Sequence, residues 1–353
     1  MIHAKFSRLR RALLTLSVAA SVGVPMIDAA RPATVPAPVP VSTGLPLIEA
    51  TPTLLAERYA TSRGDIQAAE RTAAQHGDRR RAVALHVMAG AERQFLSFDG
   101  RDGGRTVEVL GDLAAAEHIA VLVPGADTHL DKYGLLHGGA LRLRQALGNR
   151  YAVVAWLGYR TPATVSFDAL TAGQAEEGAV ALRAFVRQLS AANGGGARVS
   201  LVCHSYGTVV CGRAAPGLDV ARIVLTGSPG IGADDVGALR TRATIWAARG
   251  SRDWIDAVPN TQLHLPFVTL GFGPDPVSPA FGARVFAAGQ AAHSDYLTAG
   301  SLSLHNIARI IAGQDPVQTE RRPMRAPSRA AVPGRGTVGS SAQQGAGGVS
   351  GHA

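Results

Sequence analysis

The chain has 353 residues, of which 46% are apolar, and its formal net charge is +9. This apolar content is typical of a globular protein with a large core, and the length suits one sizeable α/β domain with tails. Nine of the 35 basic residues lie in the first 11 residues and over residues 321–335, and the others equal the 26 acidic residues in number. The body of the chain is therefore neutral, so we expect no nucleic-acid partner.

The first 30 residues have the pattern of a secretory signal peptide. Four basic residues precede an apolar run over residues 12–24, and alanines at positions 29 and 30 suit cleavage. The run has 13 residues, whereas a spanning helix needs about 20. We therefore expect a secreted protein with no stable membrane span. The proline-rich residues 31–50 are predicted to form an extended linker.

Residues 51–316 are expected to fold as the main domain. A helical segment over residues 52–90 opens it, with breaks near Gly64 and Gly77. Strand-like residues 93–98 and 105–110 flank a turn rich in Asp and Gly, which is typical of a β-hairpin. Residues 317–353 are small and polar with almost no large apolar side chain, so we predict a disordered tail.

From residue 119 onward, apolar strand-like runs alternate with helical segments. The predicted strands are residues 119–123, 151–156, 199–202, 223–225, 244–247 and 284–287. The predicted helices are residues 139–147, 174–189, 206–214, 234–241 and 303–311. This alternation predicts a mostly parallel central sheet with helices on both faces. An antiparallel hairpin before the parallel strands fits the order of the α/β-hydrolase fold.

Ser205 is the candidate nucleophile, because a buried strand leads into it and a helix leaves from it. A serine hydroxyl is a weak nucleophile that needs an adjacent base. A tight strand-to-helix turn exposes its Oγ at the carboxyl edge of the sheet, and such turns need small residues two positions away on each side. Gly207 provides one, and Cys203 stands where the G-x-S-x-G pattern has glycine. The alternative role for Ser205 is a helix N-cap.

Ser228 is a minor alternative nucleophile, since it also follows a strand. Pro229 and Gly230 interrupt any helix after it, so we expect Ser228 in a loop that lines the site.

The two cysteines, Cys203 and Cys211, are predicted to lie at a strand end and inside a helix. We expect them to be too far apart for a disulfide bond and too few for a zinc site.

The acid and the base are expected after the nucleophile, in the order that this fold uses. Asp253 follows the strand at 244–247 and is the first choice for the acid, with Asp256 as the alternative. His293 follows the last strand and is the candidate general base. A buried carboxylate beside it would hold the imidazole in the correct tautomer. We expect His204, next to the nucleophile, to point away from this face.

Two backbone N–H groups are candidates for stabilising an oxyanion. The Tyr206 N–H lies at a helix N-terminus, and the Ala126 N–H lies in the loop after the strand at 119–123. Gly125 would permit the close approach of that loop. Trp156 and Tyr159, at the end of the next strand, are expected to line the substrate cleft together with Gly125.

Taken together, these segments resemble the actinobacterial family of uncharacterised α/β-hydrolase-fold proteins that was once grouped as a domain of unknown function. The resemblance covers residues 95–312 and lies in residues 124–125, 156–159, 204–207, 227–230, 281–284 and 293–296. It implies the fold and a triad of Ser205, Asp253 and His293, and it implies no particular substrate. The chain departs from the family at Cys203, where members usually have glycine. It also departs at residues 272–276, where members often have a His-Gly-x-Asp-Pro run.

We expect hydrolysis of a carboxylic ester through an acyl-enzyme, acting on a small-molecule ester or acyl substrate without a metal or organic cofactor. The same triad would serve an acyltransferase or a peptidase, and a non-catalytic exported binding protein could retain the fold. The short connection between the strands at 223–225 and 244–247 leaves no space for a large cap. The proline-rich residues 259–279 are therefore predicted to cover the site.

Overall fold

A computed structural model describes residues 35–42, 46–164, 166, 168–264 and 269–318. The predicted signal peptide over residues 1–30, and residues 319–353 of the predicted tail (residues 317–353), lie outside the described residues. The described residues belong to one compact unit. None of the helices over these residues is both long and apolar enough to cross a lipid bilayer.

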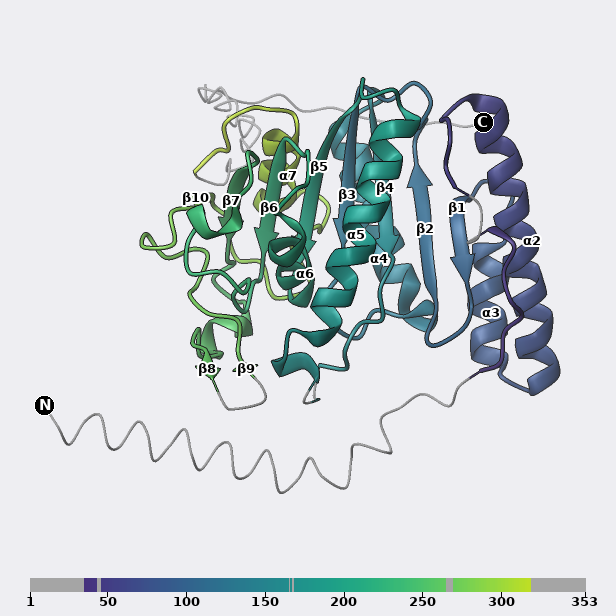
Figure 1. Cartoon of the computed structure of the whole chain (residues 1–353), viewed down its shortest axis with the longest axis horizontal. Coiled ribbons are helices and arrows are strands. Elements are labelled where there is room, and N and C mark those ends of the chain that lie inside the picture. Colours follow the sequence, from purple (N-terminus) through teal and green to yellow (C-terminus); the bar gives the residue numbers. More distant parts are fainter. Residues whose placement is uncertain (1–34, 43–45, 165, 167, 265–268, 319–353) are drawn as a thin grey trace, which may run out of the picture. The chain divides into compact units, whose positions relative to one another are not determined.

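An eight-stranded sheet with the order β1-β2-β4-β3-β5-β6-β7-β10 forms the centre of this unit (Figure 1). The hairpin of β1 and β2 is antiparallel, β2 pairs antiparallel with β4, and every pairing from β4 to β10 is parallel. The predicted fold class, a mostly parallel sheet with an N-terminal antiparallel hairpin, is confirmed. The strands are β1 (Gln94–Asp99), β2 (Arg105–Leu110), β3 (His118–Val123), β4 (Tyr151–Leu157), β5 (Arg198–His204), β6 (Arg222–Thr226), β7 (Thr244–Ala248) and β10 (Arg284–Val285).

Helices cover both faces of the sheet, as the alternating sequence predicts (Figure 1). Along β3, the side chain of Val121 packs in one apolar cluster with α5 (Gly173–Ala192) and α6 (Tyr206–Ala214). The next residue, Leu122, packs in a second cluster with α4 (Tyr133–Leu147) and α7 (Leu302–Ile311). Successive strand residues point to opposite faces, so a strand buried on both sides must be apolar throughout.

The N-terminal helical segment is broken at one of the two predicted glycines. The helix α2 (Pro52–His76) runs through Gly64 and ends at Gly77, whose φ of 88° is in the left-handed region that favours glycine. The helix α3 (Arg79–Met88) follows at once. A glycine inside a helix costs about 1 kcal/mol relative to alanine. Here α2 packs its apolar side against β1, and that burial outweighs the local cost.

Some observed elements differ from the predicted ones. The helix expected at 234–241 is only a 3₁₀ turn, η4 (Gly237–Leu239). The last strand, β10, has two residues instead of the four expected. A small antiparallel pair, β8 (Leu263–His264) and β9 (Thr269–Leu270), lies in the proline-rich stretch where no strand is expected. Such short elements depend on tertiary hydrogen bonds more than on local sequence pattern.

Part of the predicted linker packs against the domain. The backbone N–H groups of Val41 and Ser42 donate to the carboxylate of Asp65 on α2, at 2.9 and 2.8 Å. The Phe98 N–H on β1 donates to the hydroxyl of Ser42, which is buried. The side chain of Asp65 therefore replaces the backbone partners that an extended strand would otherwise lack.

Candidate active site

The carboxyl ends of the parallel strands lie level with one another, which brings the loops after them together. The register pairs Val123 of β3 with Cys203 of β5, and His204 of β5 with Thr226 of β6. Thr226 in turn pairs with Ala248 at the end of β7. All candidate catalytic residues follow one of these ends, as ligand sites do in open α/β sheets.

Ser205 occupies a strained turn between β5 and α6. Its φ of 54° and ψ of −128° lie in a region that residues with a side chain rarely adopt. The surrounding backbone is crowded. A Cβ on Gly207 would lie 2.4 Å from the Pro124 oxygen, and a Cβ on Gly125 would lie 2.6 Å from the Ser205 Cβ. Both positions therefore require glycine, and the predicted strand-turn-helix geometry is present.

Cys203 and Cys211 form a disulfide bond, with their Cα atoms 6.5 Å apart. The prediction that they are too distant to bridge was wrong. The helix α6 turns back along the end of β5, so that a residue in its second turn lies beside the residue two before Ser205. Both cysteines are fully buried. The bond therefore closes a covalent loop around the candidate nucleophile.

Three predicted residues form a continuous chain of hydrogen bonds. His293 Nε2 lies 2.9 Å from Ser205 Oγ, and His293 Nδ1 lies 2.8 Å from Asp253 Oδ1. Asp253 follows β7, and His293 lies in the loop after β10. The alternative acid, Asp256, has a side chain that is 75% exposed and is paired with Arg249. Asp253, and not Asp256, is the carboxylate that contacts the imidazole.

The carboxylate of Asp253 is fully buried and has three hydrogen-bond donors. Besides His293, they are the Tyr296 hydroxyl at 2.6 Å and the Ile255 N–H at 2.9 Å. Burial works to raise the pKa of Asp253, but the hydrogen bonds from His293, Tyr296 and Ile255 outweigh it, and the pKa is lowered. The group is therefore ionised at neutral pH. The sequence pattern alone predicts no role for Tyr296, although it lies only three residues after His293.

His204 contacts the base instead of pointing away from it, which corrects the sequence-based expectation. Its Nε2 lies 2.5 Å from the carbonyl oxygen of His293, and the two ring centroids are 4.8 Å apart. Burial, together with the nearby His293, lowers the pKa of His204 to about 4. The imidazole is therefore neutral at pH 7, and its Nε2–H donates to the His293 carbonyl.

The loop after β3 is fixed against Ser205. The Tyr159 hydroxyl donates to the Pro124 oxygen at 2.7 Å, and the Asp127 N–H donates to the Pro162 oxygen at 2.9 Å. Ala126 lies between these two anchors. The Tyr206 N–H is at the first position of α6, where it has no acceptor within the helix. That the N–H groups of Tyr206 and Ala126 bind an oxyanion stays a prediction.

Trp156 and Tyr159 lie in the core and do not line a cleft, contrary to expectation. Both are buried, and their rings stack at a centroid distance of 5.9 Å beside Phe185 of α5. Trp156 belongs to the face of β4 that α5 covers, so its side chain points under that helix. Tyr159 is linked to the loop beside Ser205 by its hydrogen bond to the Pro124 oxygen.

The loop after β6 contacts the triad through Gly227. A Cβ there would lie 2.9 Å from Asp253 Oδ2 and 3.2 Å from His293 Nδ1. Ser228, the alternative nucleophile, is buried, and its Oγ lies 2.8 Å from Thr208 Oγ1. Its hydroxyl also bonds to the backbone of Gly230. These bonds hold Ser228 inside the turn, and none of its hydrogen-bond partners among the described residues is a base.

The described part of the proline-rich stretch lies beside the start of α6. The ring of Phe272 meets that of Tyr206 edge-on at 5.6 Å. The Gly271 N–H donates to the Leu170 oxygen at 2.9 Å, and Asp275 pairs with Arg249 at 2.6 Å. These contacts tie the stretch to the loops around the triad. A covering role for residues 259–279 stays a prediction.

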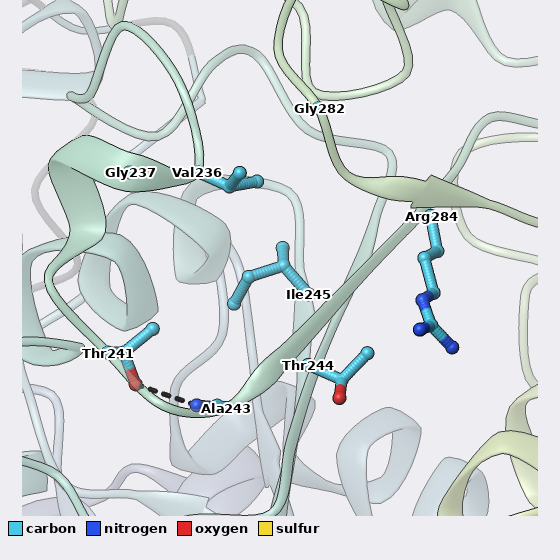
Figure 2. A pocket seen from close by; sticks show the side chains of 8 residues that line it. All are labelled: Val236, Gly237, Thr241, Ala243, Thr244, Ile245, Gly282 and Arg284. Atoms are coloured by element: carbon cyan, nitrogen blue, oxygen red, sulfur yellow. Dashed lines mark hydrogen bonds between the residues drawn. The ribbon is translucent and has the colours of Figure 1, made fainter.

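A separate small cavity lies at the opposite edge of the sheet (Figure 2). Its lining includes Thr244 and Arg284, the first residues of β7 and β10. The catalytic candidates follow the other ends of these parallel strands. The cavity therefore does not belong to the candidate active site.

Comparison with known proteins supports the fold. The profile of the family described as alpha/beta hydrolase matches residues 99–263. Two uncharacterized proteins of Mycobacterium tuberculosis, from strains CDC 1551 / Oshkosh and ATCC 25618 / H37Rv, are each 30% identical over 62% of this chain. The chain spans 38% of the length of these curated relatives. These matches agree with the α/β-hydrolase part of the expected resemblance, and the narrower actinobacterial family stays a prediction.

Solved structures with a related arrangement have low sequence identity to this chain. A serine hydrolase without a lid from Xanthomonas campestris is 18% identical with a TM-score of 0.42, covering 64% of this chain and 95% of that chain. An esterase named PE8 is 16% identical with a TM-score of 0.38, covering 58% of this chain and 96% of that chain.

Proposed function

We propose that the protein is a serine hydrolase that cleaves carboxylic esters, with Ser205 as nucleophile, His293 as general base and Asp253 as the residue that orients the base. The observation that carries the proposal is the hydrogen-bond chain from Ser205 Oγ through both nitrogens of His293 to Asp253. This is the geometry that nucleophilic catalysis by serine requires. The strained backbone of Ser205 is a second support, since strain persists where a site requires it.

The proposed reaction has two halves. Ser205 Oγ attacks the ester carbonyl carbon while its proton passes to His293 Nε2, and the N–H groups of Tyr206 and Ala126 stabilise the oxyanion. The carbon–oxygen bond to the alcohol then breaks as His293 returns the proton to the departing oxygen. Water next attacks the acyl-enzyme by the same route, which releases the acid and restores Ser205.

The residues around His293 suit the positive charge that forms on it during the reaction. Asp253 is ionised at neutral pH and lies against the imidazole, so it stabilises the imidazolium that forms in each half-reaction. His204 is neutral, so no cation opposes that charge from the other neighbour. The Gly227 backbone lies so close to Asp253 and His293 that no larger side chain fits there, so a substitution at Gly227 would displace the acid or the base.

We also propose that the chain is exported. The disulfide between Cys203 and Cys211 supports this proposal, because disulfides persist in oxidising compartments and are rare in the cytosol. The basic and apolar pattern of the first 30 residues is the sequence feature behind it. The mature N-terminus of protein recovered from the culture medium should lie between about residues 25 and 35. Full-length protein confined to the cytosol would contradict export.

Hydrolysis of short p-nitrophenyl esters by purified protein tests the proposed activity. Ser205→Ala should lose at least about 10³-fold in kcat/KM, and His293→Ala should lose a similar factor. Ser228→Ala should retain turnover, because its hydroxyl is bonded to Thr208 on α6 and to the Gly230 carbonyl rather than to a base. Activity that survives in Ser205→Ala and disappears in Ser228→Ala would overturn the assignment. Transfer to added alcohols, or cleavage of the matching amides, would identify an acyltransferase or a peptidase.

A further inference from the structure

Trp254 is the only exposed Phe, Tyr or Trp side chain among the residues that the structure describes, with 51% of its surface accessible. It directly follows Asp253 and begins the short 3₁₀ helix η5 (Trp254–Ala257). An indole has a large apolar surface, and leaving half of it in water forgoes much of the stabilisation that burial would give. A functional contact would explain this position.

The exposed indole lies against the candidate general base. Its ring centroid is 4.4 Å from that of His293, with an angle of 46° between the planes. Among the described residues, the other ring in contact with His293 is that of His204, which is hydrogen-bonded to the His293 backbone. Of the two neighbouring rings, only Trp254 therefore offers a broad surface to a molecule arriving from solvent.

The chemistry of the proposed reaction determines which part of a substrate lies beside His293. The proton that His293 Nε2 takes from Ser205 returns to the oxygen of the departing alcohol, so that oxygen must come within hydrogen-bonding distance of the imidazole. The carbon group on this oxygen then extends past His293. A flat apolar group there would reach the neighbouring indole and cover its exposed face.

We propose that Trp254 forms a subsite for the leaving group, and that the preferred substrates are esters whose alcohol carries an aromatic or other flat apolar group. The inference rests on the proposed ester hydrolysis and adds the chemical class of the alcohol. Once the alcohol has left, the acyl group remains on Ser205. The indole therefore acts on formation of the acyl-enzyme and not on its hydrolysis.

A comparison of two butyrate esters tests whether Trp254 binds the alcohol part of the substrate. Benzyl butyrate and 2-methoxyethyl butyrate share the acyl group, and their alcohols have similar acidity, but only the first carries a flat apolar ring. Trp254→Ala should lower kcat/KM for the benzyl ester about tenfold and for the methoxyethyl ester less than about twofold. Trp254→Phe, which retains an aromatic face, should keep most of the preference. The matched control is Leu135→Ala on α4, an exposed apolar residue outside the site, which should change neither value.

The remaining outcomes contradict the proposal in distinguishable ways. Equal losses for both esters in Trp254→Ala would mean that the ring only positions His293, and no loss for either would mean that it has no role. A fall in the rate of hydrolysis of a preformed butyryl-enzyme would place the indole in the wrong half-reaction. If the wild-type protein cleaves neither ester and Ser205 is never acylated, the proposed function fails, and the subsite fails with it.

Discussion

Tyr296 donates a 2.6 Å hydrogen bond to Oδ2 of Asp253, while Oδ1 of the same carboxylate faces His293. Both oxygens of the buried acid are therefore occupied. The tyrosine hydroxyl also accepts a hydrogen bond from the Gly250 N–H, which ties the loop after β7 to the segment after His293. The orientation of the acid depends on a residue three positions beyond the base.

Replacing each carboxylate by an amide should reduce activity strongly at Asp253 and little at Asp256. Asp253→Asn should lower kcat by about 10³–10⁴-fold, because an amide at this place favours the wrong imidazole tautomer. Asp256→Asn should stay within about twofold of wild type, since the Asp256 side chain is exposed and its carboxylate bonds only to Arg249 among the described residues. Steady-state kinetics on one ester suffices, and the reverse ranking would show that the acid is wrongly assigned.

Removal of the tyrosine hydroxyl should lower stability in a pH-dependent way. The pKa of Asp253 is lower in the folded protein than in the unfolded chain, so its ionised contacts stabilise the fold above the unfolded pKa of about 3.9. Tyr296→Phe should lower the free energy of unfolding at pH 7 by about 1–3 kcal/mol. Urea unfolding should show this difference shrinking as the pH falls below about 4. A difference that is independent of pH would contradict a bond to the charged carboxylate.

His204 should give the fold a specific sensitivity to acid. Its pKa of about 4 is below the ordinary value of 6.5. Between these two pH values the unfolded chain therefore binds a proton at this histidine, whereas the folded protein does not. Wild-type stability should therefore decrease as the pH falls from about 6.5 towards 4. His204→Gln, which retains an N–H donor, should show a weaker decrease in Tm over this window. His305→Gln on α7 is the control with an exposed histidine, and it should follow the wild type.

The disulfide should stabilise the turn that carries Ser205. Cross-linking residues this close in sequence is worth about 2–3 kcal/mol in the chain-entropy model. Cys203→Ser combined with Cys211→Ser should lower the free energy of unfolding by about that amount. Denaturant unfolding measures it, and a free-thiol assay on the unfolded wild type should detect no thiol before reduction. Two reactive thiols in the unreduced wild type would contradict the bond.

The sequence was sufficient to predict that Ser205, His293 and Asp253 lie together, and the reason is geometric. Parallel strands end at one edge of a sheet, so residues that follow separate strands, such as Ser205 and Asp253, can be predicted to meet there. Chain order then limited the choice of base to His293. Between Asp253 and Asp256 the sequence alone left both open, since three residues within a turn can face opposite directions.

The contacts that the sequence did not reveal depend on how elements pack. The bond between Cys203 and Cys211 requires the path of α6 relative to β5, which no local pattern specifies. The roles of His204 and Tyr296 require the position of the loop after β10. For Trp156 the sequence predicts a contact that the structure lacks. Its position near a strand end predicts that it faces the cleft, but α5 covers the face of β4 on which it lies.

The covalent site of a fluorophosphonate probe tests the central claim most directly. Such probes phosphonylate only a serine that a neighbouring base activates. Peptide mapping of the labelled wild-type protein should find one adduct, on Ser205, and labelling should disappear in Ser205→Ala and weaken strongly in His293→Ala. An adduct on Ser228, or no adduct on well-folded protein, would contradict the assignment of Ser205 as the nucleophile.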